Sequence, residues 1–266
     1  MKKILIIGKR GFIGNSLNIY LKKFYSVTHT SYKNLNRFKM KINNFDYVIN
    51  TSINRNYIFK RYNYKFDNDL KISKLIKNDK TIYIFLSSRK VYKFKANIKE
   101  NDKLLPKTNY AKNKLITEEK LQKIFNNKLI ILRISNVIGN KRNIRSLHNT
   151  FIDIFFQNIK NGYILDNKKD YKDFISIEKF CEITKHIIKN NLNGIFNVSI
   201  GKKIFLNDIL KWLNKFNNKQ VIIKNKNIID ECFYLNNQKL MSKIKIKNSV
   251  SELKNYCLKI SKKKFN

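Results

Sequence analysis

The chain has 266 residues, of which 57 are Lys or Arg and 18 are Asp or Glu, so its formal net charge is +39. Because 42% of its residues are hydrophobic and 13% are aromatic, the chain can close a core as one large domain or two small ones, and wholesale disorder is excluded. One proline and seven glycines exclude collagen-like and linker-dominated chains.

A charge of +39 would ordinarily suggest a nucleic acid or an anionic membrane as partner. The lysines, however, are spread over nearly the whole chain and form no single tail or block, which favours a solvated basic surface. We therefore expect no specific nucleic-acid partner, although the excess charge should attract polyanionic small molecules.

Cysteine usage and the N-terminus indicate a cytoplasmic protein. Cys181, Cys232 and Cys257 are odd in number and far apart, which suits a reducing compartment and provides neither a disulfide framework nor a zinc site. The apolar run at residues 4–7 is too short for a signal peptide, whose core needs about 7–15 residues. No segment approaches the ~20 apolar residues of a membrane span, so none is expected.

The order of apolar and helical segments predicts a parallel sheet covered by helices. Short apolar runs, each typical of a buried strand, lie at residues 4–7, 47–49, 82–86, 129–134 and 195–198. Stretches that look helical lie between them, for example at residues 12–23, 68–77 and 110–125. This alternation indicates an α/β fold with a doubly wound parallel sheet. After about Gly139 the pattern loosens, and residues 141–172 are polar and lack a clear strand.

A glycine-rich loop follows the first expected strand and precedes a helix. It reads Gly8-Lys9-Arg10-Gly11-Phe12-Ile13-Gly14, a GxxGxxG spacing. Glycine permits a tight turn and a close approach of the backbone to a pyrophosphate, and a helix N-terminus offers free N–H groups with a partial positive charge. The position of the loop therefore favours a dinucleotide-binding site over an ordinary strand-to-helix turn.

Further motifs follow this loop in a fixed order along most of the chain. They are VINTS at 48–52, Asn68, SSRKVY at 87–92, YAKNK at 110–114, RISNVIG at 133–139 and DFISI at 173–177. Together with GKRGFIG at 8–14, they resemble the motifs of the extended branch of the short-chain dehydrogenase/reductase superfamily, which comprises nucleotide-sugar epimerases, dehydratases and ketoreductases. The resemblance implies a Rossmann fold, an NAD(P) cofactor and a nucleotide-sugar substrate.

The resemblance also implies particular contacts. Those to the cofactor would come from Gly8, Gly11, Phe12, Ile13, Gly14, Asn50, Thr51, Tyr110 and Lys114. Asn136 matches the asparagine that contacts the substrate diphosphate, with a turn-capping asparagine as the alternative. In the RDFIHV motif the usual Arg is Lys172 and the usual His or Tyr is Ser176, so Asp173 is expected to be structural and to bond backbone groups.

Tyr110 and Lys114 match the YxxxK motif and share one face of the expected helix, one turn apart. An unperturbed phenol titrates near pH 10, so acid–base work at pH 7 needs a fall in pKa of about 3, worth about 4 kcal/mol, which a neighbouring ammonium and a cationic nicotinamide ring can supply together. Ser88 follows the strand at 82–86, where open α/β sheets bind ligands, and the motif selects it over Ser87. We expect Ser88, Tyr110 and Lys114 to be catalytic, with Ser88 also holding the substrate oxygen. An exposed tyrosine and lysine on an ordinary helix are the alternative.

The end of the second expected strand, at residues 26–31, favours NADP over NAD. The Asp or Glu that usually binds the ribose 2′-hydroxyl of NAD is missing, and the first acid is Asp46. Arg10, with Lys33 and Arg37 downstream, offers cations for a 2′-phosphate, and GKRG also resembles the loop of GDP-fucose synthase and related NADPH reductases. The three histidines show no paired spacing, so no metal site is expected.

These observations lead to one organisation of the chain and one favoured reaction. Residues 1–140, with 173–200 returning to them, are expected to form the dinucleotide-binding domain, and residues 141–172 and 201–266 a small interleaved substrate lobe. The favoured reaction is 4-keto reduction of a nucleotide sugar. Epimerisation at C4 with retained NAD and a non-catalytic Rossmann binding protein are the alternatives, and a homodimer is left open. Dehydration is disfavoured because Arg89 and Lys90 replace the family's Asp-Glu pair.

Overall fold

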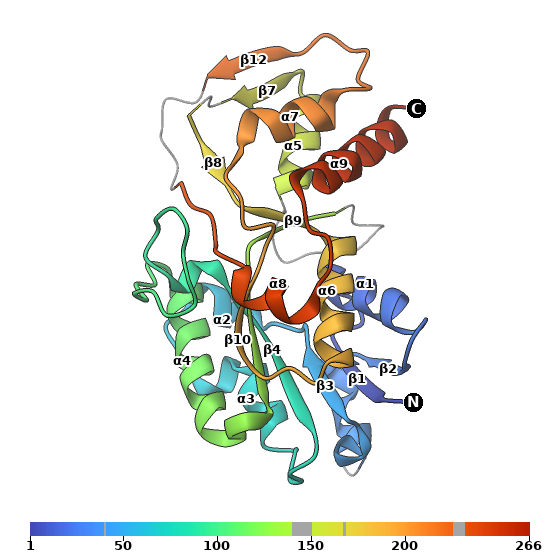
Figure 1. Cartoon of the computed structure of the whole chain (residues 1–266), viewed down its shortest axis with the longest axis vertical. Coiled ribbons are helices and arrows are strands. Elements are labelled where there is room, and N and C mark those ends of the chain that lie inside the picture. Colours follow the sequence, from blue (N-terminus) through green and yellow to red (C-terminus); the bar gives the residue numbers. More distant parts are fainter. Residues whose placement is uncertain (40, 140–150, 167–168, 226–231) are drawn as a thin grey trace.

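The computed structural model describes residues 1–39, 41–139, 151–166, 169–225 and 232–266, and its centre is a parallel sheet of six strands (Figure 1). The strands are β1 (Lys3–Ile7), β2 (Ser26–Thr30), β3 (Tyr47–Asn50), β4 (Ile82–Ser88), β5 (Leu129–Ile134) and β10 (Gly194–Val198). They pair in the order β10-β5-β4-β3-β1-β2, and every pair is parallel. The predicted doubly wound sheet is confirmed. Its strand order reverses between β1 and β3, and ligands of open α/β sheets bind at the carboxyl ends beside such a reversal.

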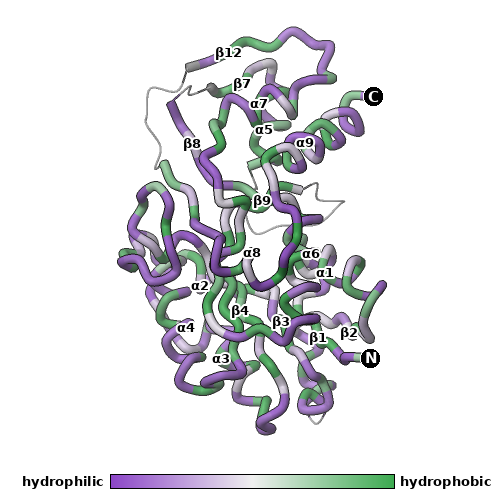
Figure 2. The backbone as a smooth tube through the Cα atoms, viewed as in Figure 1, coloured by the Kyte–Doolittle hydropathy of each residue, from purple (hydrophilic) through white to green (hydrophobic). Residues whose placement is uncertain are grey.

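Helices cover both faces of this sheet. Helices α1 (Phe12–Leu21) and α6 (Ile177–Lys189) lie together on one face, and α3 (Asn68–Ser73) and α4 (Asn109–Phe125) on the other. In β1, Ile4 and Ile6 pack with the first pair of helices, whereas Leu5 and Ile7 pack with the second pair. All four side chains are buried, and each such burial stabilises the fold by about 1.5–3 kcal/mol. A strand buried on both faces has to be apolar throughout, as the tube coloured by hydropathy illustrates (Figure 2).

A smaller group of elements lies beyond the carboxyl ends of the sheet (Figure 1). It contains α5 (Phe151–Lys160), β7 (Tyr163–Asp166), α7 (Leu206–Asn214), β12 (Ile222–Asn225) and α9 (Val250–Phe265). Its helices enclose a second apolar cluster that includes Phe155, Leu213 and Cys257. Strand β12 runs parallel to β7, and β8 (Tyr171–Lys172) pairs with β11 (Ile204–Phe205). Contrary to the sequence analysis, the described part of residues 141–172 thus contains strands; they are short and pair on one side, so they need no long apolar run.

The chain crosses between the sheet and this smaller group several times. Strand β6 (Asn136–Ile138) leaves the sheet and pairs with β9 (Phe174–Ser176), after which α6 and β10 return to it. Helix α8 (Gln238–Ile244) packs against β10 and α6, although its residues lie in the segment expected to form the substrate lobe. Helix α2 (Arg55–Phe59) packs against α4. The exact division into two domains stays a prediction.

The longest helix in the described ranges is α4, with 17 residues. None of the helices that the structure describes combines the length and the apolar character that crossing a bilayer requires.

A buried ion pair fastens α4 to the sheet. Arg133 of β5 donates from Nη2 to Oε2 of Glu118 over 2.7 Å, and from Nε to both carboxylate oxygens over 3.2 Å. Ser87 of β4 donates its hydroxyl to the Oε1 atom of the same glutamate. The side chains of Arg133 and Glu118 are only 3% and 1% exposed. The pair is therefore shielded from water, and loss of one partner would leave an uncompensated buried charge.

Replacement of Arg133 by methionine should lower the free energy of unfolding by about 3–5 kcal/mol, because Glu118 would keep a buried charge without its cation. The double variant Arg133→Met, Glu118→Gln removes both charges and should recover more than half of that loss. Urea unfolding followed by circular dichroism measures both values. A loss below about 1 kcal/mol in the single variant would contradict the anchoring role.

Candidate active site

The glycine loop between β1 and α1 is shaped by its close approach to Thr51. Gly8 has a φ of +126°, a backbone conformation that residues with a side chain rarely adopt, and a Cβ there would collide with Thr51 Oγ1. A Cβ on Gly14 would collide with the same atom and would lie 2.6 Å from the Gly8 carbonyl oxygen. A Cβ on Gly11 would meet nothing closer than 3.4 Å. The fold therefore requires glycine at positions 8 and 14, whereas at position 11 it leaves room for a side chain.

Hydrogen bonds tie this loop to the ends of β2 and β3. The Gly8 N–H donates to the Thr30 carbonyl oxygen over 2.8 Å. Thr51 donates to the Ile7 carbonyl oxygen from its backbone N over 2.7 Å and from its hydroxyl over 2.9 Å. The loop leads into α1, whose N-cap residue Gly11 supplies no side-chain cap. The first N–H groups of α1 are therefore left for an anion such as a pyrophosphate.

Phe12 and Ile13 open α1 with their side chains packed against the core of the sheet. A Cβ on Gly139 would collide with the Phe12 ring, so the end of β6 also lies against this residue. Because the side chains are used in packing, a cofactor contact from Phe12 or Ile13 would have to come from the backbone N–H groups.

Three polar side chains form a connected set beside the end of β3. The Asn50 Oδ1 atom accepts from the Ser52 backbone N over 2.9 Å and from the Ser52 hydroxyl over 2.6 Å. Asn68 donates from Nδ2 to the same hydroxyl over 3.2 Å. Ser52 and Asn68 border a small surface hollow, whose other lining residues are Ile53, Asn54, Tyr57, Phe66 and Asp69. These contacts fix the segment that follows β3, to which the predicted cofactor residues Asn50 and Thr51 belong.

The three predicted catalytic residues come from the end of β4 and the start of α4. Ser88 is the last residue of β4, and its Oγ accepts from the Lys90 backbone N over 3.3 Å. Tyr110 is half-buried in the first turn of α4, and Lys114 lies one turn further on. The ammonium of Lys90, two residues beyond Ser88, lies 6.0 Å from the centre of the Tyr110 ring, and α4 packs against β4.

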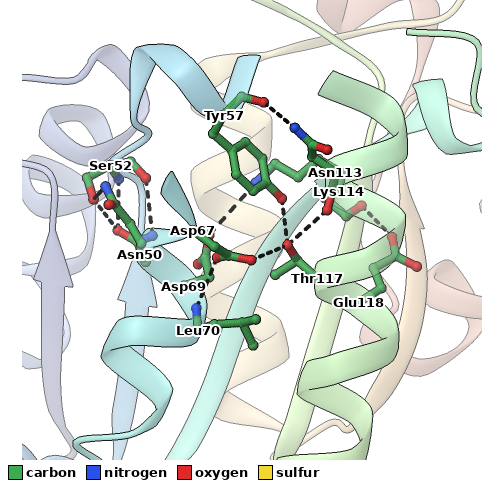
Figure 3. Close-up of polar contacts among 12 residues, drawn as sticks. Asn50, Ser52, Tyr57, Asp67, Asp69, Leu70, Asn113, Lys114, Thr117 and Glu118 are labelled. Carbon is green, nitrogen blue, oxygen red and sulfur yellow. Dashed lines mark hydrogen bonds and ion pairs between the residues drawn. The ribbon is translucent and has the colours of Figure 1, made fainter. Parts of the chain in front are cut away.

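The ammonium of Lys114 lies in a buried setting (Figure 3). It is 4.0 Å from Asp69 Oδ2 and 4.4 Å from the centre of the Phe85 ring. Asp69 also accepts from the Tyr83 hydroxyl over 2.8 Å. Burial raises the pKa of Asp69 to about 6, and the nearby Lys114 charge opposes this rise. Asp69 was not predicted from the sequence; its signal was an acid directly after Asn68, on a helix that packs against α4.

A second buried carboxylate, Asp67, is hydrogen-bonded to the middle of α4 (Figure 3). It accepts from the Thr117 hydroxyl over 2.6 Å and caps α3 by accepting from the Leu70 N–H over 3.0 Å. One turn earlier, Asn113 donates to the carbonyl oxygens of Tyr57 and Lys60 over 2.8 and 2.9 Å. Roles for Asp67, Asn113 and Thr117 were not predicted from the sequence, although Asn113 and Thr117 have the spacing of one helix face.

Asn136 lies where β6 meets β9. Its Nδ2 donates to the Asp173 carbonyl oxygen over 3.1 Å, and its Oδ1 accepts from Arg89 over 3.4 Å. The Arg89 guanidinium stacks over Phe233, 3.8 Å from the ring centre. Asn136 is therefore held by two neighbours at the boundary between the sheet and the smaller group of elements. Ser176 accepts from the Lys179 N–H over 3.1 Å and caps α6.

Asp173 is a completely buried carboxylate that joins separate segments. Its Oδ2 accepts from the backbone N–H groups of Gly201 and Leu235 over 3.2 and 3.0 Å. Burial raises its pKa to about 7, and the hydrogen bonds from Leu235 and Gly201 oppose the rise. The side chain thus bonds backbone groups from two distant parts of the chain.

The region around the end of β2 carries basic rather than acidic side chains. Arg10 is exposed in the glycine loop, and Lys33 and Arg37 are exposed in the segment after β2. Asp46 accepts from the Lys3 backbone N over 2.6 Å. It therefore lies beside the amino end of β1, whereas the glycine loop follows the carboxyl end of that strand. Among the described residues, no group of three or more His, Cys, Asp or Glu side chains is placed to hold a metal ion.

Comparison with known proteins extends these observations. The model of the NAD-dependent epimerase/dehydratase family matches residues 4–199. No curated protein sequence matches the chain. A solved UDP-N-acetylglucosamine 4-epimerase from Methanobrevibacter ruminantium M1 shares 22% identity, with a TM-score of 0.79 over 98% of this chain and 97% of that one. A dTDP-4-dehydrorhamnose reductase from Yersinia enterocolitica shares 18% identity, with a TM-score of 0.77 over 100% of both chains. A dTDP-glucose 4,6-dehydratase from Bacillus anthracis, solved with NAD, shares 13% identity, with a TM-score of 0.76 over 98% of this chain and 96% of that one.

The substitution Asp173→Asn should change how the stability of the protein depends on pH. The pKa of Asp173 is about 7 in the folded chain and about 4 when unfolded, so the folded state binds this proton more tightly. The contribution of the group to stability is complete below pH 4 and is lost as pH rises toward 7. An asparagine has no such proton and still accepts from both N–H groups.

The free energy of unfolding is measured in urea at several pH values. The difference between variant and wild type should therefore shift in favour of the variant by about 1–4 kcal/mol between pH 4 and pH 8. A constant difference between the two proteins would show that Asp173 titrates normally.

Proposed function

Because the chain belongs to the NAD-dependent epimerase/dehydratase family, we propose that this enzyme reduces the 4-keto group of a nucleotide-activated sugar with a nicotinamide dinucleotide. The observation that carries the proposal is that α4, which begins with Tyr110 and Lys114, packs against β4, which ends at Ser88, and that the Lys90 ammonium just beyond Ser88 lies 6.0 Å from the Tyr110 ring. An acid, a cation on the same helix face and a hydroxyl are the groups that proton transfer to a carbonyl oxygen requires.

The glycine loop fits a dinucleotide. Its backbone is free of side chains at Gly8 and Gly14, and α1 begins without a side-chain cap, so the N–H groups of residues 12–14 would hold the pyrophosphate. The segment at Asn50 and Thr51 would border the cofactor. When bound, the dinucleotide supplies the hydride for the sugar carbonyl. NADP is preferred, because Arg10 can contact a 2′-phosphate and because no Asp or Glu lies between the end of β2 and Asp46, which lies beside the amino end of β1.

The side chains at the end of β4 and on α4 supply proton donation, a hydrogen bond to the carbonyl oxygen and a contact to the ribose. Tyr110 donates its phenolic proton to the carbonyl oxygen as negative charge develops there. Ser88 donates a hydrogen bond to the same oxygen. Lys114 holds the ribose of the cofactor, and its charge stabilises the tyrosinate that remains. Asn136, oriented by Arg89 and Asp173, binds the diphosphate of the substrate.

Arg89 and Lys90 favour reduction over dehydration, because cations there cannot replace the carboxylates of a dehydratase. A 4-epimerase with retained NAD is the second candidate, favoured if NAD binds more tightly than NADP. In either reaction, residues 1–140 with 173–200 form the dinucleotide-binding domain, to which Ser88 and Asn136 also belong, and residues 141–172 with 201–266 form the substrate lobe; residues 40, 140–150, 167–168 and 226–231 of these ranges lie outside the described residues. Protection against thermal unfolding by a panel of nucleotide sugars would identify the substrate.

The substitution Tyr110→Phe should reduce turnover at least about a hundredfold and leave cofactor affinity nearly intact, because only the proton donor is lost. Oxidation of NADPH, followed by absorbance with 4-keto nucleotide sugars, measures turnover. Lys112→Ala is the matched control, since Lys112 is exposed on the same helix and should not affect turnover. Near-normal turnover of the Tyr110 variant would refute the mechanism.

The wild type should bind NADPH about tenfold more tightly than NADH, a difference of about 1.4 kcal/mol, because Arg10 adds a charge-assisted contact to the 2′-phosphate. Arg10→Ala should remove most of this preference by weakening NADPH alone. Fluorescence titration of both proteins with both cofactors measures the four affinities. Equal weakening of the two cofactors would make Arg10 a general loop residue, and tighter binding of NADH by the wild type would favour the epimerase.

A further inference from the structure

Asp69 is placed to act on Lys114 electrostatically. Its Oδ2 atom is 4.0 Å from Lys114 Nζ, and the two side chains are 7% and 8% exposed. Within the part of the chain that the structure describes, Lys114 forms no other ion pair. Because water is excluded from both groups, the attraction between them is stronger than at a protein surface.

The position of the Asp69 carboxylate is fixed independently of Lys114. Its Oδ1 accepts from the Tyr83 hydroxyl over 2.8 Å, and Asn50 provides a further side-chain hydrogen bond. On the other side, the Lys114 ammonium lies over the Phe85 ring (Figure 3 shows the ion pair). The sheet therefore holds Asp69 from β3 and β4, and Asp69 in turn holds the ammonium that α4 presents.

We infer that Asp69 is a positioning residue that sets the charge seen by Tyr110: as a carboxylate it offsets the Lys114 ammonium, and as a neutral acid it leaves that ammonium uncompensated. The inference rests on the proposed roles of Tyr110 and Lys114. A tyrosinate beside a compensated ammonium is less stable than one beside a free ammonium, so the protonation state of Asp69 controls how readily Tyr110 releases its proton.

The other titratable groups that face Asp69 do not replace it. Asp67, the N-cap residue of the same helix, accepts from the Thr117 hydroxyl at its Oδ2 and from the Leu70 N–H at its Oδ1. Burial raises the pKa of Tyr83 on β4 and of Tyr57 on α2 well above the ordinary range, so both stay neutral at physiological pH. Burial also raises the pKa of Tyr32, which follows β2. Asp69 is then the group in this set that changes charge near pH 6.

The experiment is an NMR titration of Tyr110 in the full-length protein with 13C at the tyrosine Cζ positions, without turnover. The Tyr110 signal is identified by its absence in Tyr110→Phe. In Asp69→Asn, the midpoint of this signal should fall by about one pH unit relative to the wild type, because the Lys114 ammonium would no longer be offset by a carboxylate. Tyr83→Phe is the matched control, since it removes a hydrogen bond from Asp69 but leaves the charge in place, and its midpoint should stay at the wild-type value.

The wild type provides a second measurement if Asp69→Asn does not fold. Its Tyr110 signal should show a small additional step near pH 6, where Asp69 titrates. An unchanged midpoint in Asp69→Asn, an equal shift in Tyr83→Phe, or a wild-type curve without the step would overturn the inference. Failure of the proposed reaction is recognised separately, because a protein without 4-keto reductase turnover would still show the shift.

Discussion

Burial of carboxylates under α4 is the constraint on which the site depends. Glu118 binds Arg133 of β5, and Asp67 binds Thr117, so the helix is attached at two successive positions on its inner face. The same helix carries Tyr110 and Lys114 in its first turns. Because each attachment joins groups that water does not reach, small rotations of α4 would break hydrogen bonds that nothing else could replace. The orientation of the two proposed catalytic residues is therefore set by polar contacts more than by apolar packing.

These contacts explain why α4 differs from α1 and α6 on the opposite face of the sheet. Asn113, Lys114, Thr117 and Glu118 are all buried, although each is polar or charged. Helices on the opposite face bury mainly isoleucine, leucine and phenylalanine. Desolvation makes such a polar face costly unless every group finds a partner, and here the partners come from α2, α3, β4 and β5. The polar face is stable only in the assembled fold.

Apolar runs predicted the central strands because β1, β3, β4 and β5 are covered on both faces, and such strands must be apolar throughout. The motif positions of Ser88, Tyr110 and Lys114 could also be read directly, since strand ends and helix turns follow from local spacing. Asp69 and Asp67 could not, because their importance depends on which helix α3 packs against. Strands β7 and β8 escaped prediction for a related reason: a short strand paired on one side leaves little hydrophobic pattern.

The repeated crossings of the chain between the sheet and the smaller group have a consequence for any attempt to isolate the nucleotide-binding part. A polypeptide ending after β6 would lack β10, which pairs with the outer edge of β5, and α6, which covers α1. Unpaired N–H and C=O groups along residues 130–134 and an uncovered apolar helix face would then be open to other molecules. Such a fragment should aggregate, and gene truncations or domain exchanges in this protein would have to keep the C-terminal segments that complete the sheet.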